Sequence, residues 1–341
     1  MPLTMRPWSI NCYVTSKVWF RCGSVDLRVA DTSAISSSVK SWLYADLLEK
    51  PSEAIMCRPI NFGGLGVINV KFKAQAMLIR TFMETAANPQ FRNNLLHSVL
   101  FRYHVLGDTS VPDPGYLPYY PSSFFKAIKQ VHDETPLNVK TMSTSQWVRI
   151  LTEDGLTMET VDTRQYRPCK AEISAASNDW PLSWRLCRLP GLSSEQSSFN
   201  FKLLHGLLVT KERLQQLTPA TSATCTHCHD LVNEDLQYAL LHCQYNDGVG
   251  QSLLLALQNL SPTITPSSLL RLELDDIPED SELSAITFIS TCLMEVWTRR
   301  FNKTKIRLYE IRATLEARCI LLRETRFASQ LQTFVDLLRN F

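Results

Sequence analysis

The chain has 341 residues, of which 45% are hydrophobic and 20% are charged. This ordinary globular balance excludes wholesale disorder, and the length indicates two or three compact units. The net charge of +2 excludes a polycation, so any contact with nucleic acid has to come from a local basic patch.

Apolar residues recur at helical spacing in the first predicted unit, residues 1–87. Trp8 and Trp19 lie on one such stripe, and Trp42 begins a second. A proline and three glycines between residues 58 and 66 predict a sharp loop. The apolar stretch that follows predicts another helix, so we expect this unit to consist of helices joined by turns.

The second predicted unit, residues 88–179, has a less regular pattern. Four prolines between residues 111 and 121 predict a rigid linker. Short helices are predicted over 124–131 and 146–151, and we expect this unit to be a connector.

The last two predicted units are residues 180–245 and 246–341. In the first, an apolar stretch predicts a helix over 199–208, and Thr210 is a candidate cap for the next helix. No glycine or proline follows Pro278, which predicts one or two long helices at the end of the chain. The expected fold is therefore mainly α, with two or three helical units.

Three of the ten cysteines are spaced like metal ligands. Cys225 and Cys228 form a Cys-x-x-Cys turn, which places two thiolates at the separation that one tetrahedral zinc requires. Fourteen residues later, His242 and Cys243 form a second element that closes the site. The mainly α fold is therefore expected to include a small zinc knuckle. Because zinc binds cysteine as the thiolate, we expect folding of this segment to be coupled to metal.

The fourth zinc ligand has three histidine candidates. His242 is the first choice, although it neighbours Cys243 and successive side chains on a helix point about 100° apart. His229 directly follows the Cys-x-x-Cys turn, and His227 lies inside it. A redox Cys-x-x-Cys pair and unrelated buried thiols are the alternatives, but the local concentration of histidine and cysteine favours zinc.

A specific order of residues surrounds these cysteines. Trp180 and Trp184 come first, the stretch 199–214 contains Phe-Lys-Leu-Leu-His-Gly and Lys-Glu-Arg-Leu, and Glu234 and Asp235 precede the last cysteine. This order resembles the zinc-binding region of the reverse transcriptases of non-LTR (LINE-type) retrotransposons.

Three further stretches carry the same resemblance. Residues 12–19 end in Ser-Lys-Val-Trp, and residues 62–70 contain Gly-Gly-Leu-Gly. Both resemble the family's segment just after the polymerase palm. Residues 293–300 contain Trp-x-x-Arg and resemble a helix near the family's carboxy terminus. The resemblance therefore covers much of the chain, apart from residues 88–178.

Two departures separate this chain from the family's pattern. Tyr238 stands where the family has a histidine five residues before its last cysteine, and tyrosine is a poor zinc ligand. The palm's paired aspartates are missing, since Leu47 stands where a second aspartate would follow Asp46. The resemblance thus implies a zinc-binding, nucleic-acid-associating carboxy-terminal part of the enzyme, without polymerase activity of its own.

Charge is segregated near the end of the chain. Acidic residues dominate 228–285, and basic residues dominate 295–341. The first basic residues of the second stretch are candidate contacts to the phosphates of RNA or DNA with low sequence specificity, or else one solvated helix face. These residues are Arg299, Arg300, Lys303, Lys305 and Arg307. The alternative function is a zinc-stapled module that binds a protein partner and no nucleic acid.

The sequence also suggests where the chain resides. No apolar run of signal-peptide length follows Met1, and no stretch has the length needed to span a bilayer. Scattered cysteines then indicate a reducing compartment, nuclear or cytoplasmic, and no membrane partner. No catalytic motif or nucleotide-binding loop is recognisable, so we expect no enzyme activity and no small-molecule substrate.

Overall fold

The computed structural model describes most of the chain: residues 1–15, 18–19, 29–45, 47–48, 50–60, 63–87, 94–116, 122–134, 142–153, 180–228, 230–259, 261–274, 276–304, 306–321 and 326–338. These residues form helices and turns with no strand among them, which confirms the prediction of a mainly α fold. None of the helices in these ranges combines the length and the hydrophobicity that crossing a membrane requires.

The α-helices are α1 (Arg6–Ser9), α3 (Val29–Leu43), α4 (Glu53–Cys57), α5 (Val70–Ala87), α6 (Asn94–His104), α7 (Ser122–Glu134), α8 (Thr144–Glu153), α10 (Trp180–Cys187), α11 (Ser194–Leu204), α12 (Lys211–Leu217), α13 (Val249–Gln258), α14 (Pro266–Arg271), α15 (Glu282–Phe301), α16 (Leu308–Leu321) and α17 (Arg326–Leu337). Short 3-10 or π turns occur at Leu3–Met5, Ile10–Val14, Tyr238–His242, Gln244–Asn246 and Glu279–Ser281.

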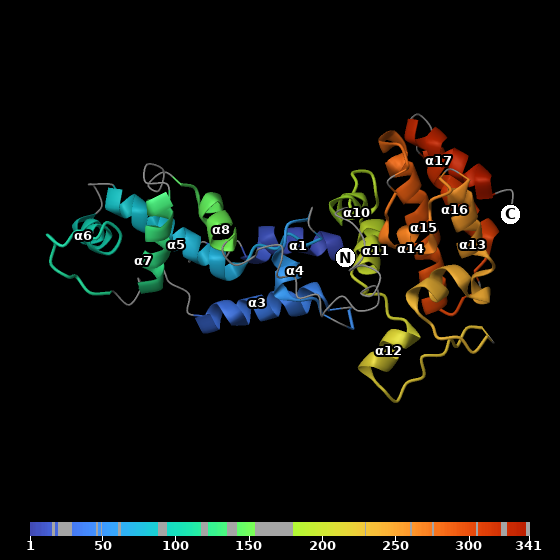
Figure 1. Ribbon diagram of the computed structural model, residues 1–341, viewed down its shortest axis with the longest axis horizontal. Coiled ribbons are helices and arrows are strands. Elements are labelled where there is room, and N and C mark those ends of the chain that lie inside the picture. The colour runs from blue at the N-terminus through green and yellow to red at the C-terminus, as the bar shows by residue number, and fades with distance from the viewer. Residues whose placement is uncertain are drawn as a thin grey trace.

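Buried apolar side chains form two separate clusters. The smaller cluster joins α5, α6, α7 and α8 around Ile79, Phe82 and Trp147. The larger cluster joins amino-terminal residues such as Leu3 and Leu43 to α10, α11 and the helices from α13 to α17. In Figure 1, α5–α8 lie at one end of an elongated molecule, α10–α17 lie at the other end, and α1, α3 and α4 lie between them.

The larger cluster contains residues from three of the four predicted units. Buried residues between 3 and 67 share this core with buried residues between 184 and 338, on both sides of residue 245. α5 packs against α3 as well as against α6 and α8, and it therefore links the two clusters.

Among the described residues, the last part of the chain contains α15, α16 and α17, where one or two long helices were expected. α15 buries an apolar stripe that includes Ile289 and Leu293, as the helical spacing predicts. The helix ends where Lys303 adopts a left-handed backbone (φ 55°) and its N–H donates to the carbonyl of Arg300. Glycine usually supplies this conformation at a helix end, so a sequence without glycine gave no sign of the turn.

Two polar contacts fix α15 against α11. Gln196 Nε2 donates to Thr291 Oγ1 at 2.9 Å, and Ser290 Oγ donates to Asn200 Oδ1 at 2.9 Å. α11 begins with a capping box, in which the side chains of Ser193 and Gln196 each accept a hydrogen bond from the other's backbone N–H. These contacts fix α15 so that its last turn lies beside the cysteine-rich segment, residues 223–246.

The glycine-rich loop at residues 63–66 packs against helices from the second half of the chain. A Cβ on Gly63 (φ 79°) would lie 2.4 Å from the ring of Trp184, so only glycine allows this approach. The Gly63 carbonyl lies 2.7 Å from Nε2 of the buried His205. Arg188 Nη2 donates to the Gly64 carbonyl at 3.2 Å. The loop therefore joins the amino-terminal helices to α10 and α11.

Candidate metal centre

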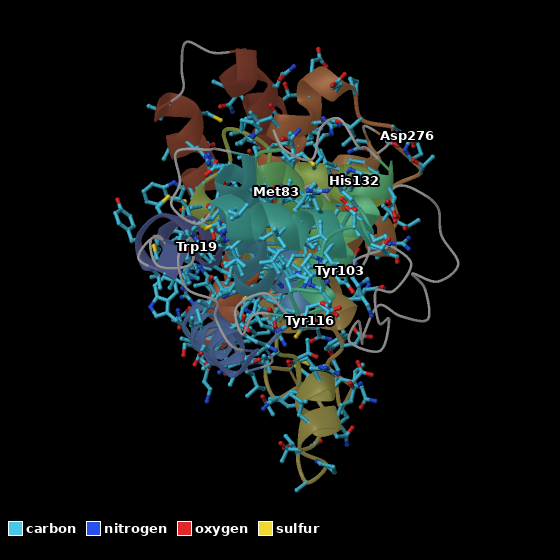
Figure 2. The ribbon with its side chains drawn as sticks, turned by 90° about the vertical axis from the view of Figure 1, so that its left-hand side faces the viewer. Trp19, Met83, Tyr103, Tyr116, His132 and Asp276 are labelled. Carbon is cyan, nitrogen blue, oxygen red and sulfur yellow. The ribbon has the colours of Figure 1, made fainter. Side chains whose placement is uncertain are left out.

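The cysteine-rich segment follows α12, which projects from the body of the molecule in two perpendicular views (Figures 1 and 2). Thr210 caps this helix through its Oγ1, as predicted. Residues 223–225 then run antiparallel to 232–234, with two backbone hydrogen bonds of 2.9 Å. This pairing closes a small loop that carries Cys225 and Cys228.

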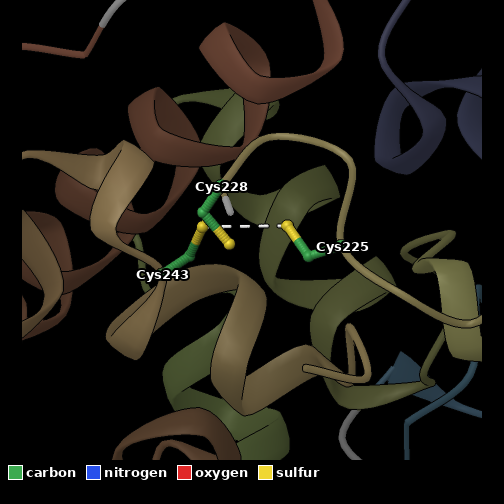
Figure 3. Close-up of side chains that lie close together, drawn as sticks. All are labelled: Cys225, Cys228 and Cys243. Atoms are coloured by element: carbon green, nitrogen blue, oxygen red, sulfur yellow. Dashed lines mark hydrogen bonds between the residues drawn. The ribbon is translucent and has the colours of Figure 1, made fainter. Parts of the chain in front are cut away.

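Cys243 approaches the same loop from the end of a single π-helical turn, Tyr238–His242. Its N–H donates to the Tyr238 carbonyl at 2.8 Å. The Sγ atoms of Cys225 and Cys243 are 3.9 Å apart, and the Sγ of Cys228 lies within 4.8 Å of both (Figure 3). The structure thus brings together, as free thiols, the three cysteines that the sequence predicts as metal ligands.

The surroundings act differently on the thiols. Cys225 and Cys243 are buried, whereas Cys228 is half-buried. Burial raises the pKa of Cys225 to about 11, more strongly than the hydrogen bonds to its sulfur lower it. Burial also acts to raise the pKa of Cys228, but hydrogen bonds, first that of Tyr238, hold it below its ordinary value. Since the thiolate is the metal-binding form, an ion bound here would displace the remaining thiol protons.

The structure does not bring His242 to the thiols. Its side chain is exposed, and the amides of Gln237 and Gln251 each lie 3.2 Å from one of its ring nitrogens. The residue predicted as the fourth ligand therefore lies outside the thiol group: Cys243, which follows the π turn, is buried, whereas the histidine ring is exposed. The His227 ring packs on Tyr245, with ring centroids 5.1 Å apart, and is also outside the thiol group. The third candidate, His229, lies outside the described residues.

Tyr238 is the side chain found next to Cys228. Its Oη lies 2.9 Å from Cys228 Sγ and 3.0 Å from Asp230 Oδ2. Gln244 Nε2 holds the other oxygen of Asp230 at 3.1 Å. Burial and these two neighbours raise the pKa of Tyr238, so the phenol stays protonated. The position that the resemblance assigns to a histidine ligand thus carries a hydrogen-bonding group.

Arg300 lies in an environment that the sequence does not indicate. The sequence offers it as a phosphate contact or as part of a solvated helix face, but it is only 3% exposed and its guanidinium contacts the cysteine-rich segment. Its Nη2 donates to Glu234 Oε2 at 2.7 Å and to Cys225 Sγ at 3.5 Å, and its Nη1 donates to Asn246 Oδ1 at 3.3 Å. The buried Glu234 pairs with this cation, which explains how both charges are tolerated in the interior.

The other predicted phosphate contacts lie in different environments. Arg299 is partly buried and pairs with Glu295 and Glu310. Lys303 and Arg307 are exposed, and Arg307 Nη1 donates to the hydroxyl of Tyr309 at 2.9 Å. Lys305 lies outside the described residues. The structure therefore leaves two of the five predicted basic residues on the described surface.

The donor set fits one metal ion. Within the described part of the chain, one group of ligand side chains is close enough to share an ion, and it consists of Cys225, Cys228 and Cys243. Cys225 and Cys243 are buried, and the backbone N–H of His227 and the guanidinium of Arg300 both donate to Cys225 Sγ, as a thiolate ligand requires.

Neither protein-family models nor curated proteins give a match to this chain.

Proposed function

We propose that this chain is a zinc-binding, nucleic-acid-associating carboxy-terminal part of a non-LTR retrotransposon reverse transcriptase, without polymerase activity of its own. The observation that carries the proposal is the thiol cluster of Cys225, Cys228 and Cys243. Sulfurs around a tetrahedral zinc with bonds of about 2.3 Å are roughly 3.8 Å apart. The 3.9 Å between Cys225 and Cys243 matches that separation without any rearrangement. Bound zinc would act as a structural cross-link.

A second observation supports the resemblance. Three of the stretches that resemble the reverse transcriptases lie in contact, although more than a hundred residues separate the first from the others. The loop at 63–66 touches Trp184 and His205. Residues that pack together in this way are expected to be retained together, which supports one common origin for these stretches.

We place the nucleic-acid contact at the turn between α15 and α16. Lys303 and Arg307 are exposed there, and so are two aromatic side chains, Phe301 (80%) and Tyr309 (55%). Basic groups beside exposed aromatic rings suit a single strand, because the cations contact phosphates and the rings stack on bases. The turn also lies next to the cysteine-rich segment, since Arg300, three residues before Lys303, donates to Cys225 and Glu234.

Filter binding of single-stranded RNA and DNA across a salt series tests this proposal. We expect affinity to fall steeply as salt rises, because each phosphate contact releases counterions. Substituting Lys303→Ala with Arg307→Ala should weaken binding to all sequences and reduce the salt slope by about two. The control is Lys126→Ala with Lys129→Ala, two exposed lysines on α7 at the other end of the molecule. Equal curves for the wild type and both double variants would remove the turn from the binding surface.

One observation favours a second candidate, the zinc-stapled module that binds protein. Leu231 is 85% exposed and has a left-handed backbone (φ 47°), and Val232 beside it is also exposed. Apolar side chains displayed on a strained turn suit a protein contact. A chain that binds one zinc and shows no salt-dependent binding of nucleic acid would favour this function.

A further inference from the structure

Arg300 reaches the thiol cluster from a distant part of the sequence. It lies in the last turn of α15, and its partner Cys225 precedes it by 75 residues. The guanidinium contacts the segment on both sides of Cys243 in the sequence, because Glu234 precedes that cysteine and Asn246 follows it. Arg300 therefore connects residues that precede Cys243 with a residue that follows it.

The partners of Arg300 are themselves fixed. Glu234 Oε1 accepts from the backbone N–H of Lys211 at 3.3 Å. Asn246 Nδ2 donates to the carbonyls of Ala239 and Leu240 at 2.8 and 3.2 Å. A guanidinium with several fixed acceptors has little freedom to turn, so its N–H group stays directed at the Cys225 sulfur.

Charge gives this contact a role in metal binding. Three thiolates and one divalent ion have a net charge of −1, which is costly to bury without a counter-charge. Arg300 supplies a permanent positive charge, but the carboxylate of Glu234 already pairs with it. The N–H donated to Cys225 is what distinguishes a role at the metal from a role as the partner of Glu234 alone.

We infer that Arg300 is a positioning residue of the metal centre, which holds the Cys225 thiolate by an outer-sphere hydrogen bond and thereby couples metal binding to the docking of α15. This inference rests on the proposed metal site. Residues behind metal ligands orient them, and their loss reduces metal affinity about 10–100-fold. We expect a loss of this size for zinc in Arg300→Met, and a smaller loss in Arg300→Lys, which keeps the charge but not the fork of donors.

The test measures zinc affinity by chelator competition and the absorption of the Co²⁺-loaded full chain. A hydrogen bond to a thiolate lowers the energy of its electrons, so removing it should shift the sulfur-to-cobalt charge-transfer band to longer wavelength. Arg299→Met is the matched control, because Arg299 lies on the same turn and its ion pairs are with Glu295 and Glu310. It should keep both the wild-type affinity and the wild-type band.

A second comparison separates the two roles of Arg300. Glu234→Gln with Arg300→Met removes the buried carboxylate that the single variant leaves without its cation. If Arg300 serves only Glu234, this double variant should recover wild-type affinity and the wild-type band, and the inference is overturned. We expect both to remain altered. The double variant and Arg300→Lys also decide the matter if Arg300→Met does not fold, as judged by circular dichroism. A wild-type chain that binds neither zinc nor cobalt would instead contradict the proposed function.

Discussion

At the scale of single residues, two local structures determine which side chains reach the metal centre. The antiparallel pairing of 223–225 with 232–234 directs Cys225 inward, and the π turn at Tyr238–His242 does the same for Cys243. The adjacent His242 is left in solvent by the same turn. Proximity in sequence is therefore a poor guide to the fourth ligand here.

The pH dependence of zinc binding follows from the buried thiol. Burial raises the pKa of Cys225 to about 11, so without metal this thiol is protonated at neutral pH. Zinc has to displace that proton, and the displacement becomes easier as the proton concentration falls. We predict that apparent zinc affinity rises with pH across the neutral range, as measured by chelator competition in buffers of matched ionic strength. An affinity independent of pH would contradict the assignment of this thiol as a ligand.

The three cysteines are predictable from the sequence. Cys-x-x-Cys spacing restricts two of them to one turn, and the His-Cys pair that follows supplies the third. The sequence could not place Arg300, since the partners of that cation are supplied by Glu234 and Asn246, more than fifty residues away. It could not exclude His242 either, because the direction of a side chain depends on the turn type, and π turns leave no clear pattern in sequence.

At the scale of elements, α11 is the support for α15. Its capping residue Ser193 accepts from Gln196 N, and the Gln196 amide reaches across to Thr291 of α15. The cap at the start of α11 therefore helps to position α15, whose last turn lies beside the cysteines.

We predict that Ser193→Ala lowers the free energy of unfolding by about 1 kcal/mol, because the N–H of Gln196 loses its acceptor. Ser194→Ala is the matched control, since it changes the same residue type one position later, beyond the cap. Chemical denaturation of both variants gives the comparison. Equal losses in the two variants would show that the cap does not contribute.

Helix positions were largely predictable, but helix ends were not. The apolar spacing predicted helices over 124–131 and 146–151, and α7 and α8 cover both stretches. The sequence does not predict the end of α15, because Lys303 takes the left-handed conformation that glycine usually supplies at a helix end. Tertiary contacts decide such positions, and local sequence does not record them.

At the scale of the whole molecule, the separation of the two hydrophobic clusters has a measurable consequence. The thiol cluster lies beside the larger core, to which Leu236, Leu240 and Leu241 belong, whereas α5–α8 form their own cluster. A structural metal stabilises the part of the chain whose folding creates its ligands.

We predict that metal removal changes amide hydrogen exchange in one part of the molecule. With a chelator, protection should fall over residues 223–246 and in the last turn of α15, and it should stay unchanged in α5–α8. A uniform loss of protection would show that the two clusters unfold together, and no change near the cysteines would contradict a structural role for the metal.

The shared core is the part of the fold that the sequence pattern does not reveal. Buried residues between 3 and 67 belong to a core built mainly by residues from 184 on. Changes in composition indicate where loops and linkers lie along the sequence. A shared core depends instead on contacts between distant residues, such as that of Gly63 with Trp184. Such contacts appear only when the chain is folded.

Metal analysis of the purified full chain tests the central claim most directly. We predict about one zinc per chain, and a loss of that zinc in Cys228→Ser because a hydroxyl is a poor substitute for the thiolate. Cys12→Ser, which changes an exposed cysteine outside the cluster, should keep its zinc. Absence of zinc from the wild-type chain, or an unchanged zinc content in Cys228→Ser, would contradict the account.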